Sequence, residues 1–190
     1  MMKITLQRLA SDVATLLGES LALECEPEES PFPGVMERVR LMASEILSDL
    51  ICGSPLERLS GGKTLQATAK VADDGMVTIE LPEDFLRLVN VKMSDWNMEA
   101  TVGGEEGSLE RALQASGWKG LRGQPERPVA VLDTRPGGKR MLRLYSSGRD
   151  AELEYGSYIP RPVFDTEGAM ECPDALYGPL LMRLAEYFKG

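Results

Sequence analysis

The fold is decided by residues 76–96, which read Met76-Val-Thr-Ile-Glu-Leu-Pro-Glu-Asp-Phe-Leu-Arg-Leu-Val-Asn-Val-Lys-Met-Ser-Asp-Trp96. From Val77 to Leu81, apolar residues alternate with polar ones, which is the period of a half-buried strand. Pro82 has no amide hydrogen for a sheet ladder, so it ends that strand. A strand-like pattern resumes from Leu86 to Met93. The stretch therefore predicts two strands joined by a Leu-Pro-Glu-Asp-Phe corner.

Further strands are expected on both sides of this stretch. Apolar residues also alternate over 65–71, and Ala72–Gly75 reads as a turn with a positive φ at Gly75, so a hairpin precedes the corner. A second hairpin is predicted from strands at 129–133 and 141–145, and another strand at 151–155. We expect loops at 97–107 and 117–128, with a short helix between them that Ser108 caps.

Three helices are expected at the two ends of the chain. Apolar residues recur at helical spacing over 4–18 and over 35–50, where Gly53 and Pro55 follow. A third stripe runs from Leu176 to Phe188 and contains Pro179, which is either near the first turn of a helix that starts late or kinks a longer helix. The acidic, proline-rich residues 24–34 are interpreted as an exposed linker.

This order predicts an α+β fold, in which an N-terminal helical hairpin packs with a C-terminal helix and an antiparallel β-sheet or sandwich is inserted between them. The expected helical part comprises residues 1–60 and 172–190, and the expected β part comprises residues 61–171, the two forming one structural unit.

Composition argues against several classes of enzyme. The chain of 190 residues has no histidine, which excludes histidine-based triads and removes the commonest zinc ligand. Its three cysteines, Cys25, Cys52 and Cys172, form no metal-binding spacing and are expected to be reduced thiols. Arg8 and Asp12 interrupt any signal-peptide core, and no apolar run is long enough to span a membrane.

The net charge of −9 is unevenly distributed along the chain. Residues 117–149 contain eight basic and two acidic residues. This polarity suits a protein that meets copies of itself or a charged partner, although a solvated hairpin face would also explain it. The candidate interaction surface consists of Arg127, Arg135, Lys139, Arg140 and Arg143.

No motif specifies catalysis, a cofactor or a metal. Ser60-Gly-Gly-Lys-Thr64 resembles part of a phosphate-binding loop, but it lacks the first glycine and the strand-to-helix context, so we interpret it as a polar loop. Acidic residues beside glycines at 72–75 and 102–107 lack calcium-loop spacing and are explained as turns. Trp96 and Trp118 are expected to pack at sheet edges rather than to stack on nucleic acid.

Four segments of the chain resemble the head-to-tail adaptor (neck) proteins of tailed bacteriophages, in particular tail tubular protein A of short-tailed phages. They are Asp74-Gly75, Leu81-Pro-Glu-Asp-Phe-Leu-Arg-Leu-Val-Asn-Val91, Ala151-Glu-Leu-Glu-Tyr155-Gly-Ser-Tyr-Ile-Pro160 and Cys172-Pro-Asp-Ala-Leu-Tyr-Gly-Pro-Leu-Leu-Met-Arg-Leu-Ala-Glu-Tyr187. Length and the helix–β–helix order agree as well. Residues 97–128 match no part of that family's pattern.

The resemblance implies a structural protein of the virion, assembled in the host cytoplasm. Such proteins form a ring beneath the portal and join the head to tail components, without a catalytic residue, cofactor, metal or small-molecule substrate. The basic residues would then meet an acidic face of the next copy or line a channel that DNA passes through. The alternatives are a protein-binding module of a mobile-element or cell-surface system, and a small enzyme that uses carboxylates.

Overall fold

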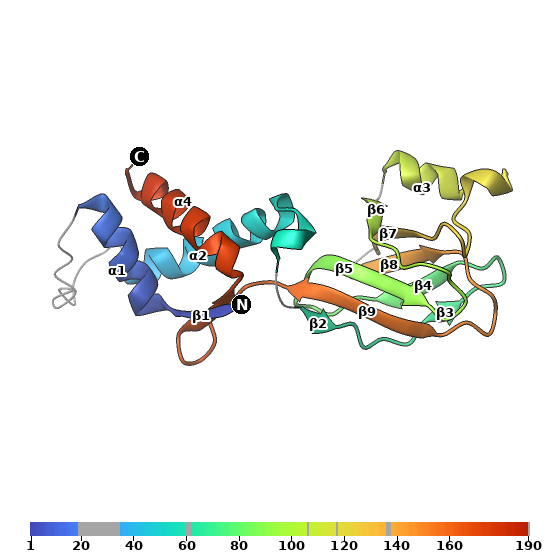
Figure 1. The fold of residues 1–190 in the computed structure, drawn as a ribbon, viewed down its shortest axis with the longest axis horizontal. Helices are drawn as coiled ribbons and strands as arrows, with labels where there is room; N and C mark the ends of the chain where they lie inside the picture. Colours follow the sequence, from blue (N-terminus) through green and yellow to red (C-terminus); the bar gives the residue numbers. More distant parts are fainter. Residues whose placement is uncertain (19–34, 60–61, 106, 117, 136–137, 190) are drawn as a thin grey trace. The chain divides into compact units, whose positions relative to one another are not determined.

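In a computed structural model, which describes residues 1–18, 35–59, 62–105, 107–116, 118–135 and 138–189, the chain divides into two compact units. The helical unit comprises Met1–Gly61 and Arg161–Gly190, and the β unit comprises Gly62–Pro160. The fold is α+β, as predicted (Figure 1). The unit boundary lies at residue 161 rather than 172, because the strand at 169–172 pairs within the helical unit.

The helical unit contains β1 (Met2–Thr5), α1 (Leu6–Leu17), α2 (Val35–Gly53), η1 (Leu56–Arg58), β10 (Ala169–Cys172), η3 (Asp174–Leu176) and α4 (Tyr177–Lys189). The three α-helices contact one another in pairs. Their inner faces bury aliphatic residues such as Leu9, Leu47 and Leu180, which exclude water from the bundle. The predicted hairpin of two helices packed with a C-terminal helix is confirmed.

The start of the first helix was predicted too early. Residues 2–5 form β1, which pairs antiparallel with β10 in the register Met2↔Cys172. Thr5 caps α1 because its side-chain oxygen accepts a hydrogen bond from the Arg8 amide. The acidic linker expected at 24–34 lies outside the described residues.

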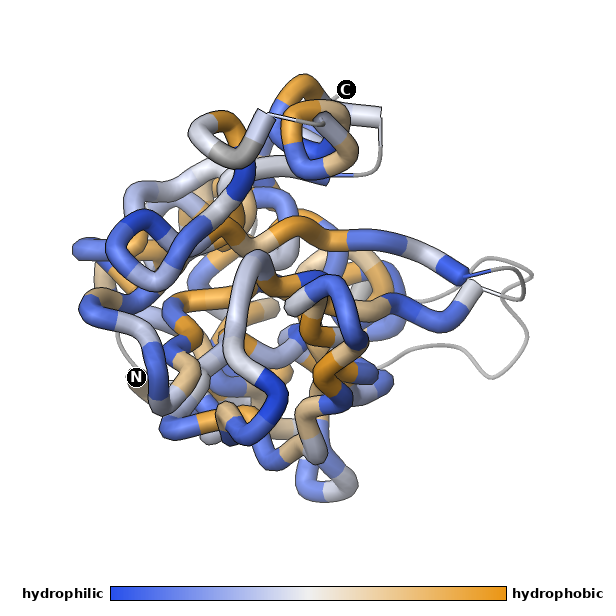
Figure 2. Tube along the Cα trace, turned by 90° about the vertical axis from the view of Figure 1, so that its right-hand side faces the viewer, coloured by the Kyte–Doolittle hydropathy of each residue, from blue (hydrophilic) through white to orange (hydrophobic). Residues whose placement is uncertain are grey.

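The β unit contains β2 (Lys63–Thr64), β3 (Lys70–Val71), β4 (Val77–Glu80), β5 (Phe85–Met93), β6 (Val102–Glu105), α3 (Leu109–Gln114), η2 (Lys119–Leu121), β7 (Val129–Thr134), β8 (Arg140–Tyr145) and β9 (Leu153–Pro160). They form a three-stranded sheet, β2-β9-β5, and a five-stranded sheet, β3-β4-β8-β7-β6. The two sheets share one core, which includes Val77, Leu88 and Leu142. Figure 2 shows apolar stretches inside this unit and polar stretches at its periphery.

The corner between β4 and β5 forms as the sequence predicts, and both strands contribute to the shared core. Gly75 has φ +82°, which confirms the positive φ expected in the preceding turn. A Cβ at Gly75 would lie 3.1 Å from the Ser147 carbonyl oxygen, so a side chain there would also crowd the neighbouring backbone.

One connection differs from the antiparallel prediction. Residues 102–105 were expected to be a loop, but they form β6, which pairs parallel with β7. The chain passes from β6 through α3 and η2 before it enters β7. Parallel neighbours need such a crossover, and a helix is its usual content. No described helix has the length and apolar content needed to cross a membrane.

Candidate interaction surfaces

The candidate basic residues reach different faces of the hairpin formed by β7 and β8. Arg143 points to the outer face of the five-stranded sheet, where its Nε lies 2.5 Å from Asp133 Oδ2. Arg140 lies three positions earlier and points to the other face, because strand side chains alternate. There its Nη1 donates to the Phe85 carbonyl oxygen at 3.2 Å, and its guanidinium lies over the Phe85 ring.

The other three candidates are more exposed. Arg135 forms an ion pair with Glu80 at 3.3 Å, and its amide donates to the Lys139 carbonyl oxygen across the hairpin end. Arg127 lies before β7, where its Nη2 donates to the Gly120 carbonyl oxygen at 2.6 Å. The structure therefore brings Arg135 and Lys139 together, but it does not gather all five residues on one surface.

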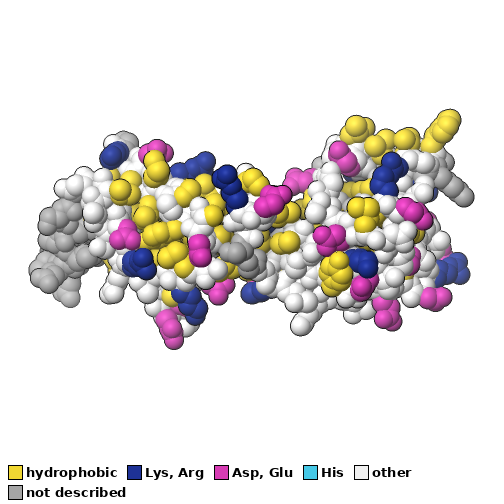
Figure 3. All heavy atoms as spheres, viewed as in Figure 1, with side chains coloured by type: hydrophobic (Ala, Val, Ile, Leu, Met, Phe, Trp, Pro, Cys, Tyr) yellow, Lys and Arg dark blue, Asp and Glu magenta, His cyan; other side chains and the backbone are white. Residues whose placement is uncertain are grey.

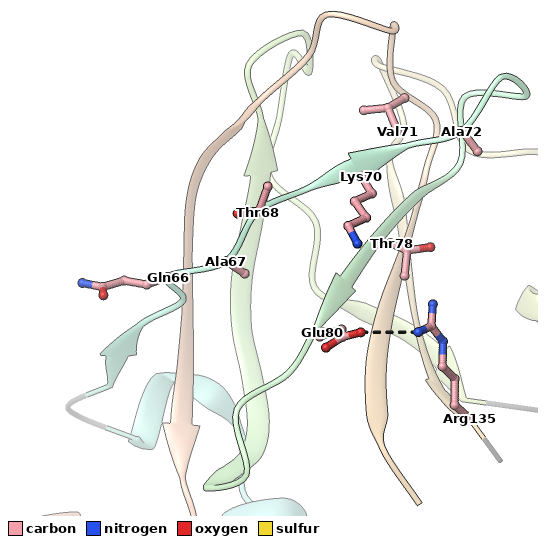
Figure 4. A pocket seen from close by; sticks show the side chains of 9 residues that line it. All are labelled: Gln66, Ala67, Thr68, Lys70, Val71, Ala72, Thr78, Glu80 and Arg135. Carbon is pink, nitrogen blue, oxygen red and sulfur yellow. Dashed lines mark hydrogen bonds and ion pairs between the residues drawn. The ribbon is translucent and has the colours of Figure 1, made fainter. Parts of the chain in front are cut away.

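A groove of about 490 Å³ runs beside the edge of β4 (Figure 4). The ladder between β3 and β4 ends at the pair Lys70↔Thr78, and no described strand residue pairs with Glu80 on this edge. Figure 4 shows Glu80 facing Arg135, with the Lys70 side chain pointing into the same space. The groove offers polar side chains and an open strand edge, which are the features that bind an extended peptide.

A second feature, here named the α3 lobe, comprises residues 108–127 except 117 and covers part of the outer face of the five-stranded sheet. Asp133, only 4% exposed, accepts ion pairs from Arg143 and from Arg111 of α3, whose Nη2 lies 3.3 Å away. Arg111 also donates to the Tyr145 hydroxyl at 3.0 Å. These contacts fix α3 to the sheet through buried charge.

Amide and backbone contacts hold the rest of the α3 lobe. The buried side chain of Gln114 accepts a hydrogen bond from the Gly123 amide at 2.8 Å and donates to the Glu110 carbonyl oxygen at 3.1 Å. A Cβ at Gly123 would lie 2.4 Å from the Tyr145 carbonyl oxygen, so only glycine allows this close approach. Beside these contacts lies a pocket of about 360 Å³, lined in part by Gln114, Arg122 and Tyr145.

The α3 lobe exposes three large apolar side chains. Trp118 is 78% exposed, Leu109 is 70% exposed and Leu121 is 47% exposed. Figure 3 shows apolar side chains gathered along α3 and the segment after it. The expectation that both tryptophans pack at sheet edges is thus wrong for Trp118, whereas Trp96 is buried and donates to the Ser146 carbonyl oxygen.

The helical unit also exposes large apolar side chains, although its core is filled. Leu16 of α1, Leu41 of α2, and Met182 and Tyr187 of α4 are each half exposed or more. Apolar side chains are visible over this unit in Figure 3. Single exposed apolar residues are ordinary on a protein surface, but here each of the three α-helices of the helical unit exposes at least one.

The motifs with possible chemistry have structural roles where they are described. Lys63 Nζ lies 2.6 Å from Asp84 Oδ2, and the Tyr158 hydroxyl donates to Asp84 Oδ1. The hydrogen bond from Lys63 is the main cause that holds the pKa of Asp84 below its usual value. Asp74 accepts a hydrogen bond from the Met76 amide within its turn. Residues 60 and 61 of the glycine-rich loop lie outside the described part.

Two groups of the helical unit have strongly raised pKa values. Burial raises the pKa of the Cys172 thiol to about 12, and the carboxylate of Asp174 adds to the shift. Burial, together with a hydrogen bond to Asp12, raises the pKa of the Tyr177 hydroxyl to about 12. Both groups are therefore neutral at physiological pH. Cys52 is exposed, and Cys25 lies outside the described residues.

Within the described ranges, no three cysteine, aspartate or glutamate side chains gather into a group that could hold a metal ion. Comparison of this chain with models of protein families and with curated proteins finds no match.

Proposed function

We propose that this chain is a structural head-to-tail adaptor of a phage or prophage, which joins the portal to tail components as one subunit of a ring. The observation that carries the proposal is the exposed apolar surface of the helical unit, where Leu16, Leu41, Met182 and Tyr187 project from three helices. A bundle with a filled core and further apolar residues outside is suited to packing against other helices.

The arrangement of the chain supports the same function. The N-terminal and C-terminal segments of the chain both belong to the helical unit, and the β unit is inserted between α2 and β10. This is the helix–β–helix order that the resemblance to neck adaptors implies. In the proposed ring, the helical unit contacts neighbouring copies and the portal, while the β unit faces a tail component.

A second candidate function, a protein-binding module of a mobile-element or cell-surface system, is favoured by the groove beside β4. An extended peptide could add to the open edge at Glu80, with Lys70 and Arg135 as charged contacts. In this case a partner would bind through the β unit, and the apolar residues on α4 would not affect its binding.

Co-purification with the products of neighbouring genes separates these two functions. A tagged full-length chain is expected to retain a portal-like or tail protein. The double variant Met182→Ser with Tyr187→Ser should lose that protein, whereas Val163→Ser, a change of an equally exposed apolar residue outside the helices, should retain it. Retention by all three chains would contradict a helical contact, and a wild-type chain that retains no such protein would contradict the adaptor function.

A further inference from the structure

The α3 lobe buries polar side chains against the sheet and exposes three large apolar side chains, whereas an ordinary surface helix buries its apolar residues. Its buried contacts are the ion pairs and hydrogen bonds of Arg111 and Gln114. Its exposed large apolar side chains are those of Leu109, Trp118 and Leu121. Tryptophan is enriched at the energetic centres of protein interfaces because it buries a large area with few rotatable bonds. An exposed tryptophan on an anchored segment therefore indicates a docking surface.

A complementary surface lies on α2 of the helical unit. Glu37, Leu41, Glu45 and Asp49 are all exposed and recur every four residues, so they lie along one side of the helix. Here this set is named the α2 stripe. Within the described part of the chain, none of its three carboxylates has an ion-pair partner. Like charges four residues apart repel, so a basic partner would relieve this repulsion.

The α3 lobe contains more basic than acidic residues, whereas the charged residues of the α2 stripe are all acidic. Residues 108–127 contain Arg111, Lys119, Arg122 and Arg127, against two acidic residues, Glu110 and Glu126. Arg127 is exposed. The two surfaces therefore match in two respects: each has an exposed apolar residue, and charges of opposite sign accompany them.

We propose that the α3 lobe of one copy docks on the α2 stripe of the next copy, with Trp118 against Leu41 and Arg127 near Glu45 or Asp49. This inference rests on the proposed function, since it identifies the contact between subunits of the ring. Two different surfaces meet in such a contact, so it is heterologous, and repetition of a heterologous contact closes a ring when the rotation permits.

Photo-crosslinking tests the proposed contact directly. A photoreactive amino acid replaces Trp118 in the full-length chain, and unlabelled and ¹⁵N-labelled protein are mixed at concentrations up to about 1 mM before irradiation. Mixed-isotope crosslinks to peptides of α2 are expected. Crosslinks only to other elements, crosslinks confined to one isotope, or no crosslink at all would overturn the proposal.

Charge-reversal variants test the proposed contact between Arg127 and Glu45 without the photoreactive group. Arg127→Glu and Glu45→Lys should each weaken self-association about tenfold, and the two changes together should restore it. Glu186→Lys, at an exposed carboxylate on α4, and Met98→Ser, at an exposed apolar residue outside the α3 lobe, are the controls. Sedimentation velocity measures the dissociation constant. Single variants that associate like the wild type, or a double variant that is not rescued, would contradict the pairing.

These experiments distinguish failure of the proposed contact between copies from failure of the proposed adaptor function. If Trp118 crosslinks to α2 of another copy but no portal-like protein co-purifies, the contact between copies stands and the adaptor function fails. If a portal-like protein co-purifies and Trp118 crosslinks to that protein alone, the adaptor function stands and the proposed contact between copies is wrong.

Discussion

Arg111 of α3 and Asp133 of β7 form an ion pair, Nη2 to Oδ2 at 3.3 Å, that joins the α3 lobe to the five-stranded sheet. The carboxylate is almost fully buried and is shared with Arg143, so two cations meet one anion beneath the lobe. Such a pair need not add much stability, but removal of one partner leaves uncompensated charge. The position of α3 on the sheet therefore depends on a buried charge cluster.

Asp133→Asn is expected to lower the free energy of unfolding of the β unit by about 2–3 kcal/mol, because two partly buried guanidinium groups lose their anion. Urea titration followed by the fluorescence of buried Trp96 measures the change. Glu80→Gln removes an exposed carboxylate from its pair with Arg135 and should cost less than about 1 kcal/mol. Equal losses for the two variants would show that the Asp133 cluster is not a buried charge site.

The pair between Lys63 and Asp84 predicts a dependence of stability on pH. The pKa of Asp84 is lowered in the folded chain, so the contribution of Asp84 is present above its unfolded pKa of about 3.8 and is lost as pH falls through its folded pKa. Asp84→Asn should therefore destabilise the β unit at neutral pH and have progressively less effect at acid pH. Urea midpoints measured between neutral and acid pH test this.

Glu83→Gln is the control for Asp84, because it removes the adjacent exposed carboxylate and leaves the pair with Lys63 in place. The account of this corner would be wrong if Asp84→Asn had the same effect at every pH.

The two described cysteines, Cys52 and Cys172, should differ in reactivity. Cys172 is fully buried and its pKa is raised to about 12, so very little thiolate is available to attack a disulfide reagent. In the Cys25→Ser variant, one thiol, that of exposed Cys52, should react rapidly, and the second should react only after unfolding in urea. Rapid reaction of two thiols in the native variant would contradict the packing of β10 in the helical unit.

Two leucines of α2 form a matched pair for testing the helical unit. Leu47 is fully buried between helices and Leu41 is 64% exposed. Leu47→Ala should cost about 2–5 kcal/mol of unfolding free energy, because it leaves a cavity in the bundle core. Leu41→Ala should change it by no more than about 0.5 kcal/mol. Far-ultraviolet circular dichroism during urea titration measures both, and similar losses would contradict the observed orientation of α2.

Local signals were sufficient for much of the fold. The stripe over 35–50, the alternation at 77–81 and 129–133, and the cap at Ser108 each correspond to an observed element, because period and capping are properties of neighbouring residues. The corner at Pro82 was predicted for the same reason.

The elements that the sequence did not predict depend on distant partners. Residues 2–5 are a strand because residues 169–172 pair with them, and 102–105 are a strand because β7 lies beside them. Gly103 and Gly104 carry no strand propensity of their own. Trp118 was placed at a sheet edge by its apolarity, but the buried polar contacts of Arg111 and Gln114 leave it outside. No pattern of neighbouring residues predicts that a tryptophan is exposed while polar residues of the same segment are buried.

The candidate basic residues illustrate the same limit. Their clustering in the sequence was visible, but the alternation of side chains along β8 sends Arg140 and Arg143 to opposite faces of the sheet. Asp133, which pairs with Arg143, could be identified only after the register of β7 and β8 was known.

Electron microscopy of the complex that forms when this chain is co-expressed with the products of its neighbouring genes tests the central claim most directly. The adaptor function predicts a ring of copies attached to a portal-like ring, with the helical units in contact with the portal-like ring. Particles that contain one copy bound to a single partner through the β unit, or a chain that remains a monomer in the presence of a portal-like protein, would contradict it.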